Sequence, residues 1–246
     1  MHRVRILMGA MCVLFEVILS PRLSPLCFGD PCRDWDALEK EIRDNLIDPG
    51  PAKERIIGLH GGLVRAYTHT VKGSARFFPV RGSSPADIGG KGGSGFVARG
   101  YDFYDGNRHG GHPAHDIFIR DKDQDGLADD TGRPAEILAF TDGIVVGVNG
   151  EWEETSEIRG GKYVWIFTPA MERYYYYAHL GEVLVQVGDM VMAGQRIGLL
   201  GRTGKNAFKK RSPTHLHFMC LSFDGGRMTP CDTYRELLSA TMHGNP

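Results

Sequence analysis

The sequence lacks any strong charge bias. Its 29 basic and 30 acidic residues give a formal net charge of −1 at pH 7. A protein that binds nucleic acid through its surface usually carries a clear excess of lysine and arginine, because it must neutralise phosphates. We therefore expect no nucleic-acid partner.

Long apolar runs are also missing. The longest, residues 6–19, is broken by Glu16 and is too short for a membrane-spanning helix. It follows a basic start with Arg3 and Arg5, and a basic start before a short apolar core is typical of an export signal. Residues 1–29 are therefore predicted to be such a signal, although no Ala-x-Ala cleavage site is present; the alternative is a buried N-terminal helix. The mature protein would be periplasmic or extracellular, either free or membrane-associated, with no stable membrane span.

Cysteine is scarce, with five residues in the whole chain. Removal of the predicted signal would take away Cys12 and Cys27. Cys32, Cys220 and Cys231 would remain, an odd number that permits no complete disulfide pairing. Cys220 and Cys231 flank a turn-rich segment, so they form either a hairpin disulfide or two small buried apolar side chains.

Helical spacing is confined to the region after the predicted signal. Residues 34–48 have apolar side chains on one face, namely Trp35, Leu38, Ile42 and Leu46. Asp34 or Asp36 would cap this helix at its N-terminus. A break rich in proline and glycine follows, and a second helix is predicted over residues 52–67. We expect residues 30–72 to form a small helical N-terminal appendage.

Glycine is abundant, with 33 residues, roughly twice the average usage. From residue 101 onward, short runs of β-forming residues alternate with turns. The predicted strands are residues 114–119, 136–140, 144–148, 163–167, 174–178, 183–187, 196–200 and 216–221. Asp142-Gly143 is predicted to be a hairpin turn. The sequence therefore predicts a mainly β protein whose main domain, residues 73–240, is an antiparallel β-sheet.

Two short strings within this β region place metal-binding side chains at even spacing. His112 and Asp116 are four residues apart, and His215 and His217 are two apart. Because side chains alternate along a strand, each pair can point into one site, whereas His115 should point away. Two nitrogens and one carboxylate oxygen, with a fourth position left for water, form the ligand set of a catalytic zinc.

A third string, Tyr177-Ala-His179-Leu180, comes at the end of a run of four tyrosines, residues 174–177. If the strand alternates regularly, Tyr175 and Tyr177 share a face with His179 and border the same groove. Tyr174 and Tyr176 would then pack on the other side of the sheet.

The three strings, His-x-x-x-Asp, Tyr-Ala-His-Leu and His-Leu-His in this order, resemble those of the lysostaphin/LytM family of zinc metallopeptidases. That family cuts peptide bonds in bacterial cell-wall peptidoglycan. The likeness extends through glycine-containing pieces at residues 188–191, 194–198 and 201–204, and it covers residues 77–234. It implies an antiparallel β catalytic domain of the duplicated hybrid-motif type.

Residue by residue, the resemblance implies that His112, Asp116 and His217 bind Zn²⁺. His179 and His215 would be the catalytic pair beside the metal, in roles that the sequence does not divide between them. The implied activity is that of a zinc metalloendopeptidase, acting as a monomer on the peptides of peptidoglycan.

Two other functions are compatible with parts of the pattern. One is a wall-binding or hydrolase-activating module on the same fold, although such modules lack some of the ligands that this chain retains. The other is a sugar-phosphotransferase carrier, whose hybrid-motif fold also uses paired histidines. The export signal and Asp116 argue against the carrier. We expect the N-terminal helices to brace the catalytic domain rather than cover its cleft, because their sequence offers no metal ligand aimed at the site.

Three further features have two interpretations each. Residues 121–130 carry alternating carboxylates like a calcium loop, but Gly132 stands where its last glutamate is expected, so the loop is either a cation site or a solvated acidic turn. Five basic residues lie just before His215: Arg202, Lys205, Lys209, Lys210 and Arg211. They form either a cleft wall or a solvated loop. His109 has the wrong parity for the metal, yet it could line the cleft.

Overall fold

The computed structural model describes residues 29–70 and 75–244. Nearly all of the predicted export signal lies outside these residues. Within them, no helix combines the length and the apolar character that a membrane crossing would need.

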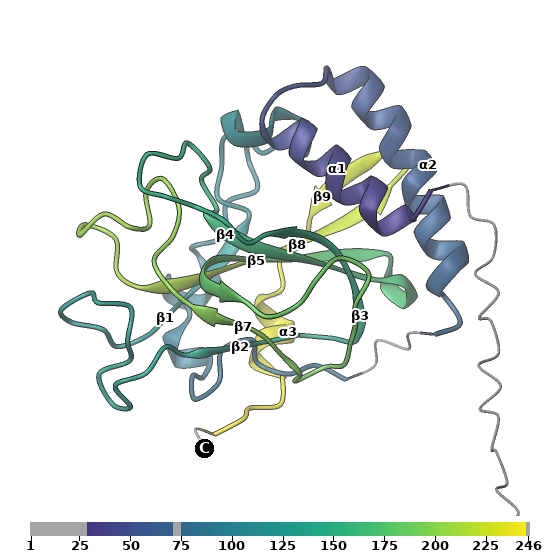
Figure 1. Ribbon diagram of the computed structural model, residues 1–246. Helices are drawn as coiled ribbons and strands as arrows, with labels where there is room; N and C mark the ends of the chain where they lie inside the picture. Colours follow the sequence, from purple (N-terminus) through teal and green to yellow (C-terminus); the bar gives the residue numbers. More distant parts are fainter. Residues whose placement is uncertain (1–28, 71–74, 245–246) are drawn as a thin grey trace, which may run out of the picture.

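One antiparallel sheet forms the centre of the molecule (Figure 1). Its nine strands are β1 (Ala114–Phe118), β2 (Glu136–Leu138), β3 (Gly143–Asn149), β4 (Lys162–Thr168), β5 (Arg173–Val183), β6 (Met190–Val191), β7 (Arg196–Leu200), β8 (His215–Asp224) and β9 (Arg227–Pro230). The order across the sheet is β1-β8-β5-β4-β3-β6, with β9 beside β8. Strand β7 pairs with both β5 and β2. The mainly antiparallel β-fold predicted from the sequence is confirmed.

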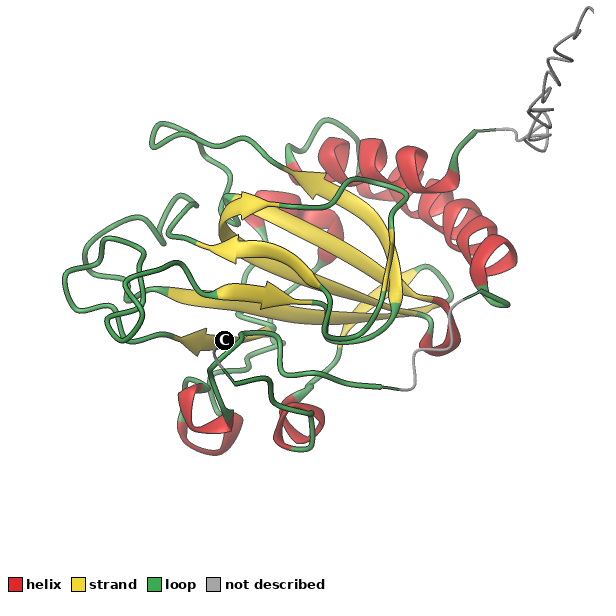
Figure 2. Ribbon diagram, turned by 60° about the horizontal axis from the view of Figure 1, so that its bottom comes forward, coloured by secondary structure: helices red, strands yellow, loops and turns green. Residues whose placement is uncertain are grey.

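Two long helices lie together against one face of this sheet (Figures 1 and 2). They are α1 (Pro31–Arg43) and α2 (Pro49–Tyr67), and a short α3 (Tyr234–Leu238) follows the last strand. Short 3-10 turns, η1 (Pro85–Asp87), η2 (Lys91–Gly93), η3 (Phe103–Arg108) and η4 (Pro169–Met171), interrupt the loops. The predicted helical region is therefore present, in contact with the sheet.

Helix α1 begins and ends earlier than the expected residues 34–48. Its N-cap is Asp30, whose side chain accepts the backbone N–H of Cys32, and proline occupies the next position. The predicted caps Asp34 and Asp36 lie inside the helix instead. Because the helix ends at Arg43, Leu46 is 76% exposed and is not part of the apolar face. Helix α2 begins three residues before the predicted residues 52–67, with Asp48 as its N-cap.

One strand prediction and one turn prediction are wrong. Residues 183–187 do not form a strand of their own, since β5 runs through to Val183 and the residues after it are irregular. Asp142-Gly143 does not join a hairpin, because β2 pairs with β7 whereas β3 pairs with β4 and β6. Gly143 lies within β3, where a Cβ atom would stand 2.3 Å from Cγ2 of Ile166. Close strand packing, and not a turn, requires this glycine.

The core consists of two clusters, one on each face of the sheet. The first joins the helices to the sheet through Trp35, Leu38 and Ile56, packed against residues such as Trp165 and Tyr174. The second fills the space enclosed by the main strands and β2–β7. The N-terminal helices therefore share a hydrophobic cluster with the β-domain; their assignment as a separate unit, residues 30–72, stays a prediction.

Replacing Trp35 by alanine should strongly destabilise the protein. Its fully buried indole stacks on Tyr174 at 5.3 Å between centroids and meets Trp165 edge-on at 5.6 Å. Removing such a buried side chain costs about 3–5 kcal/mol. Urea denaturation followed by circular dichroism would measure this loss of unfolding free energy. The exposed Leu46→Ala change should cost less than about 0.5 kcal/mol, and equal effects of the two changes would refute the anchoring role.

Candidate metal centre and cleft

Three predicted ligands come together where β1 meets β8. Asp116 of β1 and His217 of β8 are direct partners in the strand register. His112 lies two residues before β1, where its backbone pairs with Val97. Each of the three residues offers one ligand atom, and these atoms all lie within 4.8 Å of one another. Even sequence spacing and strand pairing thus bring one carboxylate and two imidazoles to one point.

Hydrogen bonds orient these side chains. The Asp116 Oδ1 atom lies 3.0 Å from His217 Nδ1 and 3.2 Å from His112 Nε2. His112 Nδ1 lies 2.9 Å from the Gly95 carbonyl oxygen, to which it can donate, so that Nε2 faces the carboxylate. A second partner on the far ring nitrogen is the usual support of a metal-binding histidine. The donor set therefore fits Zn²⁺.

The electrostatics of the cluster favour an ionised carboxylate. Burial alone would raise the pKa of Asp116, but hydrogen bonds from His112 and His217 and the neighbouring positive charge hold this pKa well below its ordinary value. An ionised carboxylate is the form that binds a cation.

His179 and His215 stand beside the three ligands. Their ring centroids are 4.9 Å apart, and the His179 ring lies 5.7 Å from that of His217. His179 Nδ1 lies 2.8 Å from the Thr203 carbonyl oxygen, and His215 Nδ1 lies 2.7 Å from that of Pro213. If each Nδ1 donates to its carbonyl, each Nε2 is left as a proton acceptor. Burial, together with the two neighbouring imidazoles, lowers the pKa of His179 well below its ordinary value, so this ring is neutral.

The face assignment of the tyrosines is corrected by the backbone at His179. This residue has φ of +68°, and the pairing register of β5 shifts near it. Regular alternation therefore stops, and His179 points to the same side as Tyr176. Tyr176 lines the cleft, whereas Tyr175 and Tyr177 lie in the core cluster on the other face. Tyr174 lies on the same face of the sheet as Tyr176 and His179, not on the face opposite His179 as predicted, and packs against the helices.

The glycine-containing piece at residues 201–204 explains how His179 is held. Gly204 has φ of +117°, and a Cβ atom there would lie 2.4 Å from the Arg159 carbonyl oxygen and 2.9 Å from His179 Nδ1. Only glycine lets this loop approach the histidine so closely.

A cavity of about 300 Å³ opens beside the cluster. Its walls come from helix α1, from the segment around η3 and from the loops that precede β4 and β8. Residues of several kinds line it beside the five histidine and aspartate residues: Glu39, Arg43, Tyr101, Phe103, Asn107, Arg159, Trp165 and Tyr176. Glu39 could have been singled out from the sequence, because it is an acidic residue next to the apolar face of the helix, between Leu38 and Ile42. The others come from loops and strand faces that spacing alone does not resolve.

The two histidines expected to lie outside the ligand set do so. His115 is 1% exposed and points away from the cleft, with Nε2 2.9 Å from Asp232 Oδ1. His109 lines the cavity, and its carbonyl accepts a hydrogen bond from Arg159.

The acidic loop, residues 121–130, is hydrogen-bonded to Thr214, the residue before His215. The buried Asp121 carboxylate accepts the backbone N–H of Gly126 and the hydroxyl of Thr214, at 2.9 and 2.6 Å. Asp121, Asp123 and Asp129 lie close enough to share a cation, so both interpretations of this loop stay open.

The basic segment before His215 lines the cavity with small residues, not with its charges. Asn206, Ala207 and Ser212 face the cavity. Arg202 instead donates to Thr214 and to backbone carbonyls of its own loop, and Lys205 pairs with Glu157. Arg202 therefore braces the loop.

The described cysteines are all free thiols. Cys220 and Cys231 are adjacent in the hairpin, where the backbone N–H of Cys231 donates to the Cys220 carbonyl. The two thiols are not joined by a disulfide in this structure.

Comparison with known families agrees with the motifs. Residues 123–230 match the sequence model of Peptidase family M23. The match includes His179, His215 and His217 and begins after His112 and Asp116. This part of the chain is therefore similar to the M23 peptidases, which bears out the resemblance to the lysostaphin/LytM type.

Several solved structures are similar to parts of the chain. A zinc-containing peptidase from Vibrio cholerae is 24% identical, covering 69% of this chain and 41% of its own, with a TM-score of 0.42. The catalytic domain of lysostaphin from Staphylococcus simulans is 23% identical over 71% of this chain and 97% of its own, with a TM-score of 0.38. A candidate glycyl-glycine endopeptidase from Ruminococcus gnavus is 21% identical over 87% and 85%, with a TM-score of 0.44. A search of curated proteins gave no significant match. The likeness to the peptidase family rests on the match over residues 123–230.

Proposed function

We propose that this protein is a zinc-dependent endopeptidase that hydrolyses peptide cross-links of bacterial cell-wall peptidoglycan. The observation that carries the proposal is the cluster of His112, Asp116 and His217, with ligand atoms within 4.8 Å of one another beside an open cavity. A peptidase family match over residues 123–230 supports the reaction class.

The residues have complementary roles in this reaction. Zinc bound by His112, Asp116 and His217 supplies Lewis-acid polarisation of the scissile carbonyl and an acidified water. The Nε2 atoms of His179 and His215 can then accept a proton from the attacking water and return it to the leaving amine. Because each Nδ1 is within hydrogen-bond distance of a backbone carbonyl, both rings are held in place before substrate binds.

The site of action follows from the substrate. Peptidoglycan lies outside the cytoplasmic membrane, so we propose an exported protein that meets its substrate in the periplasm or outside the cell. We further propose that it acts as a monomer, since the cluster is built from one chain.

Digestion of purified cell walls tests this function. Incubation of the zinc-loaded protein with walls of different cross-link chemistry should release new peptide ends from one wall type, detected by mass spectrometry of the fragments. A chelator should stop the release, and added Zn²⁺ should restore it. Binding to walls without any new fragment would instead support a non-catalytic wall-binding module.

A further inference from the structure

The cavity beside the predicted metal cluster continues towards helix α1. It is lined at one side by His112, Asp116 and His217 and at the other by Glu39 and Arg43 of this helix. The N-terminal helical region therefore does more than brace the sheet, because its side chains form part of the cleft.

Aromatic rings connect the two sides of the cavity. The Tyr176 ring lies 6.2 Å from the ring of His217 and 4.5 Å from that of Trp165. The indole Nε1 of Trp165 in turn donates to Glu39 Oε1 at 3.3 Å. With Tyr101 and Phe103, these rings form an aromatic wall that leads from the imidazoles to one carboxyl group.

That carboxyl group is buried, and its hydrogen-bond partners are neutral. Glu39 is 5% exposed, and Tyr163 donates its hydroxyl to Oε2 at 2.7 Å. Burial raises the pKa of Glu39 to about 7, against the opposing effects of the Tyr163 hydrogen bond and of Arg43. A bound cation would keep this group ionised.

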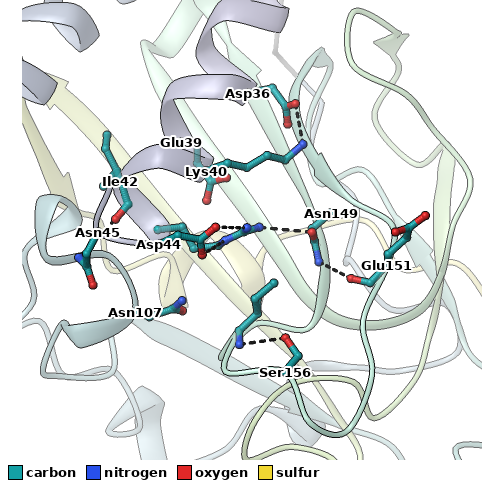
Figure 3. Close-up of polar contacts among 12 residues, drawn as sticks. Asp36, Glu39, Lys40, Ile42, Asp44, Asn45, Asn107, Asn149, Glu151 and Ser156 are labelled. Carbon is teal, nitrogen blue, oxygen red and sulfur yellow. Dashed lines mark hydrogen bonds and ion pairs between the residues drawn. The ribbon is translucent and has the colours of Figure 1, made fainter. Parts of the chain in front are cut away.

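Arg43 and Lys40, the basic neighbours of Glu39 on helix α1, have acidic partners, and Arg159, the other arginine that lines the cavity, donates to the His109 carbonyl oxygen. Arg43 forms a two-point ion pair with Asp44, at 2.8 and 2.6 Å, and also donates to Tyr163. Lys40 turns towards Asp36, at 2.7 Å (Figure 3). Within residues 29–70 and 75–244, no basic side chain reaches ion-pair distance of Glu39.

We propose that Glu39 and the aromatic wall formed by Tyr101, Phe103, Trp165 and Tyr176 are a subsite for a primary ammonium group of the substrate peptide. A carboxylate at the end of an aromatic-lined passage suits this ligand, because ring faces attract cations and the carboxylate supplies the counter-charge. The proposal rests on the proposed peptidase function and adds a substrate class: peptides with a free amine near the bond that is cut.

Chemical acetylation of the substrate tests the subsite on the unaltered protein. The probe is the most abundant amine-bearing muropeptide released from cell walls by a muramidase, compared with the same muropeptide treated with acetic anhydride. Calorimetric titration into the zinc-free protein should show that acetylation weakens binding about 10- to 100-fold, the usual worth of a charge-assisted hydrogen bond. Equal affinities would overturn the proposal.

A matched pair of variants locates the effect. Glu39→Gln keeps the size and an acceptor oxygen but removes the charge, so the native muropeptide should bind it as weakly as the acetylated one. Glu41→Gln makes the same change at a more exposed residue that pairs with Arg55, and it should keep the full preference. A preference retained by Glu39→Gln would contradict the subsite, as would a Glu39→Gln change that weakens both forms equally.

The two proposals can fail separately. If the zinc-loaded protein cuts neither form of the muropeptide while acetylation still weakens binding, the hydrolase function fails and the ammonium subsite stands. If both forms are cut and bound equally well, the function stands and the subsite fails.

Discussion

His217→Ala should purify without zinc and should release no peptide ends from cell walls. The change removes one of the three proposed protein ligands and leaves only His112 and Asp116 to hold the metal. Outer-sphere partners of a metal ligand already contribute about 10- to 100-fold to metal affinity, and loss of a ligand itself costs more. Zinc content measured by mass spectrometry should fall from one equivalent per chain to near zero.

A surface histidine provides the control for this loss. His69 is exposed after the end of α2, so His69→Ala should keep one equivalent of zinc and full activity. Full zinc retention by His217→Ala would contradict the ligand assignment.

His179→Ala should instead keep its zinc and lose most of its turnover. His179 lies beside the three ligands but is not one of them, and its Nε2 is left to exchange a proton with the reacting groups. A positioned acid or base is typically worth about 10²–10⁴ in rate, so kcat should fall by about that factor. Steady-state assays at equal zinc occupancy would measure this.

The same measurement of zinc content and turnover on His215→Ala compares the contributions of the two histidines. Its ring lies 4.9 Å from that of His179, and the resemblance gives both residues catalytic roles. Loss of zinc from His179→Ala, or unchanged turnover in both variants, would contradict the catalytic pair.

The geometry of the ligands could be predicted because it depends on local spacing. His215 and His217 share a face of one strand by simple alternation, and Asp116 lies directly opposite His217 in the register of β1 and β8. Pairing of these two distant strands could not be derived from periodicity alone. The resemblance supplied it.

Which tyrosine lines the cleft depends on the backbone conformation at His179, which regular strand alternation does not predict. The positive φ of His179 reverses the expected direction of its side chain. Tyr176 therefore lines the cleft beside it, in place of the expected Tyr175 and Tyr177. Helical spacing places Glu39 beside the apolar face of its helix, but it does not show that this side chain faces the cavity.

The predicted boundaries of the first helix are wrong because its caps, and not the spacing of apolar residues, decide where it begins and ends. The apolar spacing pointed to a helix over residues 34–48, but Asp30 and Pro31 start α1 earlier and the turn after Arg43 ends it. Similarly, the Asp142-Gly143 dipeptide has the composition of a hairpin turn, yet the tertiary pairing of β2 with β7 decides the topology.

Anomalous diffraction at the zinc edge, from crystals of the zinc-loaded protein, tests the central claim most directly. We expect one strong peak per chain, in contact with His112 Nε2, one Asp116 carboxylate oxygen and His217 Nδ1. No peak at these three atoms, or a peak held by other side chains, would contradict the account.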